Sequence, residues 1–313
     1  MRFPKTIFLT FSMGLMAGSL AFARPAALAA QDAKPPQTSP PASGQKTGTD
    51  QAKPGQPASQ AAPTATVTPE ERQAFQTINN EAAAGLDPDK VISLAEDFAK
   101  KYPNSPMLSG VYAFEATAHR QKGQLDQVVD ASEKSLKLNG DNLVSLIMLA
   151  LTLPQPQMMK GNELDKEKKL AEAEADANHA LEIIDKIPKQ PNEMDDAFKK
   201  RKGEVASEPH AALGMIHLQR STMVSVTGGM DADELTKSAQ EYQQAVTVTD
   251  HPQPEDYFRL GEVYANQNKL DDAIAAFSKA SELGQGSGIQ TYADRQIEAL
   301  KKRQAAAKPP AKP

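Results

Sequence analysis

The stretch that decides the fold runs from Pro254 to Gly284 and reads PEDYFRLGEVYANQNKLDDAIAAFSKASELG. Its apolar residues recur at spacings of three and four, which is the period of an amphipathic helix. The polar run 266–268 interrupts this pattern, so the stretch predicts two short helices joined by a tight turn. Pro254 suits the first position of a helix, and the two acids that follow it complement the helix dipole there. The residues expected to pack between the two helices are Tyr257, Leu260, Gly261, Tyr264, Ala273, Phe277 and Ala280.

Small residues in this stretch would let two helix backbones approach closely, while the aromatic rings fill the space around them. A hairpin of this kind cannot bury its apolar face alone and needs copies of itself on either side. The order aromatic, Leu-Gly, Tyr, then Ala, Phe, Ala resembles the tetratricopeptide repeat, a helical hairpin of about 34 residues. The resemblance implies an all-α solenoid in which the first helix of each hairpin lines a concave side.

Four more degenerate copies of the pattern precede this hairpin. The first begins at the capping box Thr68-Pro69-Glu70-Glu71, and the second covers 106–140. The third begins at Leu143, and Ser207-Glu208-Pro209 opens the fourth. Each of these two carries roughly a dozen extra residues at its helix–helix turn, so the two inserts should lie side by side. We therefore predict a solenoid of about five hairpins, closed by a C-terminal capping helix over 288–303.

The two inserts also lead to local expectations. The first should extend the second helix of the third hairpin toward Gly161-Asn162, and the polar segment 189–206 should hold at most a short extra helix.

Residues 1–30 have the layout of a secretory signal peptide. Arg2 and Lys5 precede an apolar run that starts at Ile7, and small-residue motifs follow it. We expect cleavage after Ala29 or the next residue. The sequence therefore predicts a periplasmic or secreted protein. Residues 98–106, FAKKYPNSP, agree with this, because they resemble repeats of periplasmic cell-envelope proteins.

An uncleaved membrane anchor is the alternative, because the apolar run 7–23 is just at the lower limit for spanning a bilayer. The segment 31–67 is rich in Ala, Pro and Gln and contains no aromatic residue, which predicts a disordered linker. The predicted repeat domain is 68–303, and 304–313 is predicted to be a disordered tail.

Composition excludes several functions. The chain has 313 residues, no Cys and a formal charge of −5. The absence of Cys excludes disulfides and thiolate metal sites, and the acidic balance argues against nucleic-acid or anionic-lipid partners. We find no phosphate loop or catalytic motif, so we predict neither an enzyme nor a cofactor. His210 and His217 share a helix face, but they occupy the packing positions of Tyr257 and Tyr264. A metal-binding or enzymatic accessory protein is therefore the less favoured alternative.

The predicted function is that of a non-catalytic scaffold that binds a partner peptide or helix in its concave groove. Arg120 is the only basic residue among the assigned groove positions, so a clamp for a partner's carboxylate is not expected. The alternatives are that the inserts or the tail cover this strip, or that an uncleaved signal makes the protein a membrane-tethered assembly factor. The sequence does not identify the partner. The residues expected to line the groove form an apolar strip with scattered acids: Ile147, Leu151, Met215, Leu218, Gln219, Glu255, Phe258 and Glu262.

Overall fold

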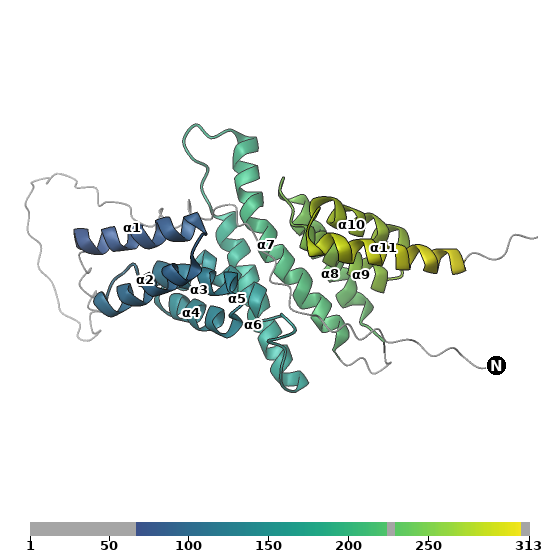
Figure 1. Cartoon of the computed structure of the whole chain (residues 1–313), viewed down its shortest axis with the longest axis horizontal. Helices are drawn as coiled ribbons and strands as arrows, with labels where there is room; N and C mark the ends of the chain where they lie inside the picture. Colours follow the sequence, from purple (N-terminus) through teal and green to yellow (C-terminus); the bar gives the residue numbers. More distant parts are fainter. Residues whose placement is uncertain (1–66, 224–228, 308–313) are drawn as a thin grey trace, which may run out of the picture.

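The computed structural model describes residues 67–223 and 229–307, and the regular structure of this part is entirely helical (Figure 1). The predicted signal peptide, nearly all of the linker, residues 224–228 of the second insert and residues 308–313 of the predicted tail lie outside the described residues. Residues 304–307 were wrongly assigned to the disordered tail, because they continue the last helix of the structure. No described helix is both long and apolar enough to cross a membrane. The eleven described helices are α1 (Pro69–Ala84), α2 (Pro88–Lys101), α3 (Leu108–Gln121), α4 (Leu125–Leu138), α5 (Leu143–Thr152), α6 (Glu163–Asp185), α7 (Asp195–Thr222), α8 (Ala232–Thr247), α9 (Pro254–Asn266), α10 (Leu270–Leu283) and α11 (Gly288–Ala307).

Local capping defines where several of these helices begin. The predicted capping box of α1 is present: the Glu71 N–H donates to Thr68 Oγ1 over 3.1 Å, and the Thr68 N–H donates to a Glu71 carboxylate oxygen. Asn162 and Asp165 form the same motif in front of α6. The expected extension of this helix toward Gly161-Asn162 is therefore confirmed, and α6 is 23 residues long.

The start of the fourth hairpin was predicted wrongly. Instead of a short extra helix and a new start at Ser207-Glu208-Pro209, the structure has one helix, α7, of 28 residues with Pro209 inside it. A proline in a helix removes one hydrogen bond and crowds the preceding turn. Here α7 packs against α5, α6, α8 and α9, and Pro209 is fully buried. The packing of α7 against these four helices outweighs the cost of the proline, so the helix continues through Pro209.

The helices form an elongated array in chain order, with α6 and α7 crossing its middle (Figure 1). Each even-numbered helix from α2 to α10 packs against the odd-numbered helices before and after it. Successive odd-numbered helices also contact one another, whereas successive even-numbered helices do not within the described chain. The odd-numbered helices therefore form the inner side of a curved array, as expected for stacked hairpins.

Each of two hairpins contains a close contact between a glycine on its first helix and an aromatic ring on its second. A Cβ atom on Gly214 would lie 2.7 Å from the Tyr242 ring, and one on Gly261 would lie 2.9 Å from the Phe277 ring. Both rings are only 1% exposed. In the C-terminal hairpin the other predicted packing residues are also covered. Leu260, Ala273 and Ala280 are buried, and Tyr257 and Tyr264 are partly buried.

Asp176 of α6 provides a test of stability against pH. Its Oδ2 atom is buried without a hydrogen-bond partner, and burial, aided by the nearby Glu172 carboxylate, raises the pKa of Asp176 from 3.8 to about 7. The folded state therefore binds this proton more tightly than the unfolded state, so its contribution to stability falls as pH rises from about 4 to 7. We expect Asp176→Asn to raise the unfolding free energy by about 1 kcal/mol at pH 8 and to change it little at pH 4. Urea unfolding at the two pH values measures this difference, and an equal effect at both would contradict the assignment.

Candidate partner-binding surface

The concave side of the array is the inner side formed by α1, α3, α5, α7 and α9. Two residues predicted to line a groove there, Ile147 and Leu151, are instead part of the core, with exposures of 4% and 9%. The reason is that α5 is short, consists almost entirely of apolar residues and is enclosed by α3, α4, α6 and α7. A helix that is apolar on all sides is buried on all sides.

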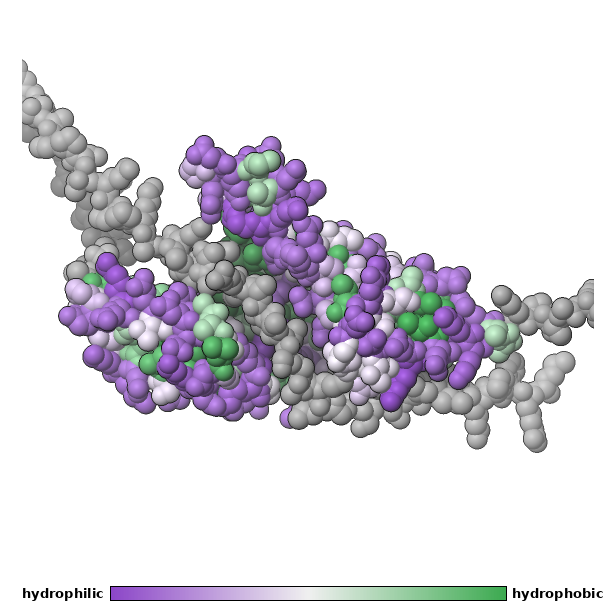
Figure 2. Space-filling model, turned by 45° about the horizontal axis from the view of Figure 1, so that its top comes forward, coloured by the Kyte–Doolittle hydropathy of each residue, from purple (hydrophilic) through white to green (hydrophobic). Residues whose placement is uncertain are grey.

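The rest of the predicted apolar strip is largely used in packing between hairpins. Met215 and Leu218 are half-buried against the core cluster of α7, α8 and α9, and Gln219 beside them is also half-buried. The ring of Phe258 packs edge-on against that of Phe277, with their centroids 5.1 Å apart. On the face drawn in Figure 2, apolar residues form separate patches among hydrophilic ones. Whether these side chains contact a partner stays a prediction.

Three charged residues of the inner helices influence one another's ionisation. They are Arg120 of α3, Glu208 of α7, and Asp256 of α9. Burial raises the pKa of Glu208 and raises that of Asp256 to about 7, and the carboxylates of Glu255 and Glu208 push the pKa of Asp256 in the same direction. The positive charge of the Arg120 guanidinium acts to lower the pKa of both acids, but the raising effects are larger. The two acids are therefore held in a setting where a negative charge is costly.

The same region contains polar atoms without a partner. Tyr242 is 1% exposed, yet its hydroxyl makes no hydrogen bond. Burial raises the pKa of Tyr242, and the charges that also act on it belong to Arg259, Asp256 and Glu262. The hydroxyl therefore lies beside the charged side of α9. The Oε2 atom of Glu255 is also buried without a partner. By contrast, Arg259 Nη1 donates to Glu262 Oε2 over 2.7 Å, so this pair is satisfied.

The sequence predicted only part of this cluster. Glu255 and Glu262 were expected in the groove, whereas Asp256 was interpreted as a helix-dipole residue and Glu208 as part of a helix start. Arg120 is 136 positions before Asp256 in the chain. No local pattern indicates that they come together, since this depends on how the hairpins stack.

The two histidines considered as a metal pair make separate contacts with α8. His210 Nδ1 lies 2.8 Å from Glu241 Oε2, and His217 Nδ1 lies 2.8 Å from Glu234 Oε2. Each histidine thus has its own carboxylate. Across the described ranges, no group of three or more His, Cys, Asp or Glu side chains is placed to hold a metal ion.

Ion pairs join the extended α6 to the end of α7, whereas residues 224–228 of the second insert lie outside the described part of the chain, so the side-by-side placement of the two inserts stays a prediction. Arg220, at the end of α7, bridges to Glu167 in the first half of α6, at 2.9 Å, and to Glu174 at its middle, at 2.6 Å. These ion pairs tie the extended part of α6 to the helix that leads into the second insert.

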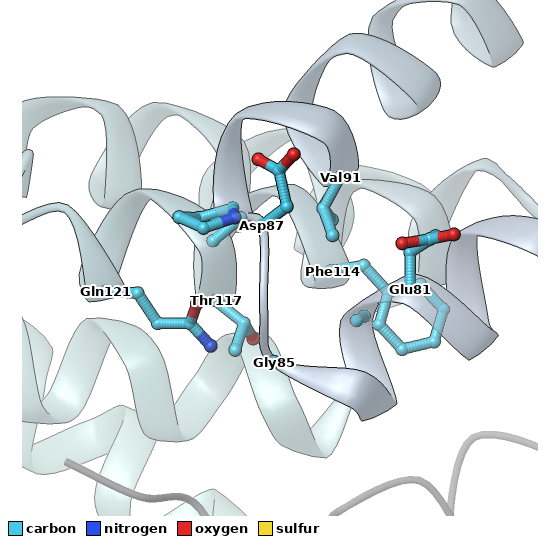
Figure 3. Close-up of a pocket in the computed structure, with 10 residues that line it drawn as sticks. Glu81, Gly85, Asp87, Val91, Phe114, Thr117 and Gln121 are labelled. Carbon is cyan, nitrogen blue, oxygen red and sulfur yellow. The ribbon is translucent and has the colours of Figure 1, made fainter. Parts of the chain in front are cut away.

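A small pocket lies between the α1–α2 turn and α3 (Figure 3). The side chains of Glu81, Asp87, Phe114 and Gln121 are among those that surround it. Its free volume is about 10 Å³, which is about the space of one water molecule. The pocket is therefore too small for a cofactor or substrate.

Comparison with known proteins agrees with this architecture. The tetratricopeptide repeat family matches the chain at residues 254–286, the hairpin of α9 and α10. No curated protein matches the chain. Among solved structures, an assembly chaperone of RpL4 (Acl4) is similar at 12% identity over 76% of this chain and 86% of its own, with a TM-score of 0.51. TTC0263, a tetratricopeptide repeat protein of Thermus thermophilus, aligns at 16% identity over 73% of this chain and 99% of its own, with a TM-score of 0.49. The hairpin at 254–286 is therefore a tetratricopeptide repeat, and it lies in an array of similar helical hairpins.

Proposed function

We propose that this protein is a non-catalytic scaffold that binds another polypeptide on its concave side, in the periplasm or outside the cell. The observation that carries the proposal is the stack of hairpins with α1, α3, α5, α7 and α9 along its inner side. Solenoids of this kind present extended concave surfaces, and they use them to bind other chains. The export part of the proposal rests on the signal-peptide layout of residues 1–30.

The character of the described surface supports binding rather than catalysis. His210 and His217 are held in separate pairs with glutamates and do not form a shared site. A concave surface that gathers charged side chains from several repeats is instead suited to an extended partner, which can contact many repeats at once.

Photo-crosslinking tests the binding surface. A photoreactive phenylalanine derivative would replace Gln219 on the inner helix α7 or, as the control, the exposed Gln244 on the outer helix α8. We expect irradiation in an envelope extract to yield a discrete adduct from position 219 and none from position 244. Equal adducts from both positions, or none from either, would contradict binding on the concave side.

The membrane-tethered assembly factor remains a second candidate because of the apolar run 7–23. Intact-mass analysis of the protein from its native host separates the two. We expect a mature chain that begins at Ala30 or Gln31, whereas a chain that retains residues 1–29 in the membrane fraction would establish the tether.

A further inference from the structure

We propose that Asn139 is a modification site, at which the side chain loses its amide group by cyclisation onto the backbone nitrogen of Gly140. Asn139 ends α4, and the turn 139–142 joins this helix to α5. The product at position 139 is aspartate or isoaspartate, which carries a new negative charge. The isoaspartate form also loosens the contacts that this turn makes with α3 and α6.

The reaction needs only the chain and water. The Gly140 nitrogen attacks Cγ of Asn139, a C–N bond forms, the proton of that nitrogen passes to the leaving group, and ammonia departs to leave a cyclic imide. Water then opens the imide at either of its two carbonyl carbons. Opening at Cγ gives aspartate, whereas opening at the main-chain carbon gives isoaspartate, in which the backbone runs through the former side chain. The net change is an amide and water converted to an acid and ammonia.

The attacking nitrogen of Gly140 is open in the structure. Gly140 is exposed, its N–H makes no hydrogen bond within the described chain, and a Cβ atom there would meet nothing within 4 Å. Asn139 is extended, with φ −145° and ψ 99°, so cyclisation requires the peptide between the two residues to turn. That movement breaks the hydrogen bond from the Asn142 N–H to the Asn139 carbonyl. Glycine has the backbone freedom to follow it, and no neighbouring group packs where a side chain would stand.

Asn104 provides the comparison within the same chain. Asn139 is the only asparagine of the sequence that glycine follows, and Asn104 is followed by serine, which is also small. However, Ser105 is only 8% exposed, and its N–H donates to the Tyr102 carbonyl over 3.1 Å. The nitrogen after Asn104 is therefore held and covered, whereas the nitrogen after Asn139 is exposed and unbonded. The structure thus assigns the modification to one of two asparagines in similar local sequences.

The turn 139–142 is a junction of four helices, so a change in its backbone affects all of them. Asn142 Oδ1 accepts from the Ser145 N–H and so caps α5, while Asn142 Nδ2 donates to Ser109 Oγ of α3 over 3.0 Å. Asp141 Oδ1 lies 2.9 Å from His179 Nε2 of α6. Isoaspartate adds one methylene group to the backbone just before these residues. Its carboxylate also lies at the C-terminal end of α4, where the helix dipole disfavours negative charge.

The direct test is ageing of the folded full chain at pH 8, followed by proteolysis and mass spectrometry of the peptides that contain Asn139 and Asn104. We expect amide to convert to acid at position 139 at least tenfold faster than at position 104. Chromatography should separate two products, because the imide opens on either side. The control variant is Gly140→Ala, which the open space at this turn accommodates. Its methyl group hinders the attacking nitrogen, so we expect conversion at position 139 to slow at least tenfold.

A second readout is the stability of the aged protein. We expect the melting midpoint of the modified fraction, measured by circular dichroism, to fall by about 2 to 4 °C, the size of effect that loss of a helix cap produces in a chain of this length. The midpoint of Gly140→Ala should stay constant over the same period. Modification without a lower midpoint would show that the junction does not depend on this turn, and that part of the proposal would fail.

Three results would overturn the modification site itself. They are equal conversion at positions 104 and 139, conversion that Gly140→Ala does not slow, and conversion of Asn139 only after the chain is unfolded in urea. The last result would mean that the folded turn protects Asn139.

Discussion

Gly203→Ala should destabilise the protein by about 3 kcal/mol, although alanine is the better helix former. A Cβ atom at this position of α7 would lie 1.8 Å from the carbonyl oxygen of Val248, at the end of α8. That atom belongs to backbone, so a side-chain rotation cannot relieve the overlap and the two helices must separate. Overpacking of this kind costs about 1 to 3 kcal/mol and sometimes more, whereas the gain in helix propensity is about 1 kcal/mol. Urea unfolding followed by circular dichroism would measure the change.

The matched control for this prediction is Gly140→Ala. Gly140 lies in a turn, and a Cβ atom there would meet nothing within 4 Å. We expect its unfolding free energy to stay within about 0.5 kcal/mol of that of the original protein. A neutral or stabilising Gly203→Ala would show that α7 and α8 do not approach as closely as the structure requires.

Phe277→Ala should have a comparably large effect, with a loss of about 3 to 5 kcal/mol. The ring is 1% exposed and lies between α9, α10 and α11, where it covers Gly261 and packs edge-on against Phe258. Removing the ring leaves a cavity in the core that α9, α10 and α11 share. The measurement is again urea unfolding, with the helical signal as the probe.

A double substitution tests the cause of this loss. In the original protein, Gly261→Ala should be destabilising, because the new methyl group would lie 2.9 Å from ring atoms of Phe277. In the Phe277→Ala background, the same change should be neutral or stabilising, because the ring is gone and alanine favours the helix. The difference between the two effects is the coupling energy of the pair. Purely additive effects would contradict the glycine–ring contact as the basis of the packing.

Local sequence patterns predicted the units of this fold well. The spacing in 254–284 predicts the α9–α10 hairpin, and capping residues predict the start of α1, because these features depend on residues only a few positions apart. The same local argument failed at Pro209. There the packing of α7 against four other helices outweighs one missing hydrogen bond.

The candidate site was less predictable than the fold. Ile147 and Leu151 have the right periodicity for an inner face, yet the neighbouring helices cover them. Conversely, Glu208 and Asp256 carry no signal of their own in the sequence, because the partners that define their environment lie on other repeats.

The sequence by itself determined that the chain is built of helical hairpins and that 254–284 is a tetratricopeptide repeat, since helix periodicity, small residues at close contacts and capping motifs are all local properties. Only the tertiary structure decided which faces of the inner helices stay open and which charges meet there. The physical reason is that burial and electrostatic environment are set by the stacking of hairpins, which joins residues more than a hundred positions apart.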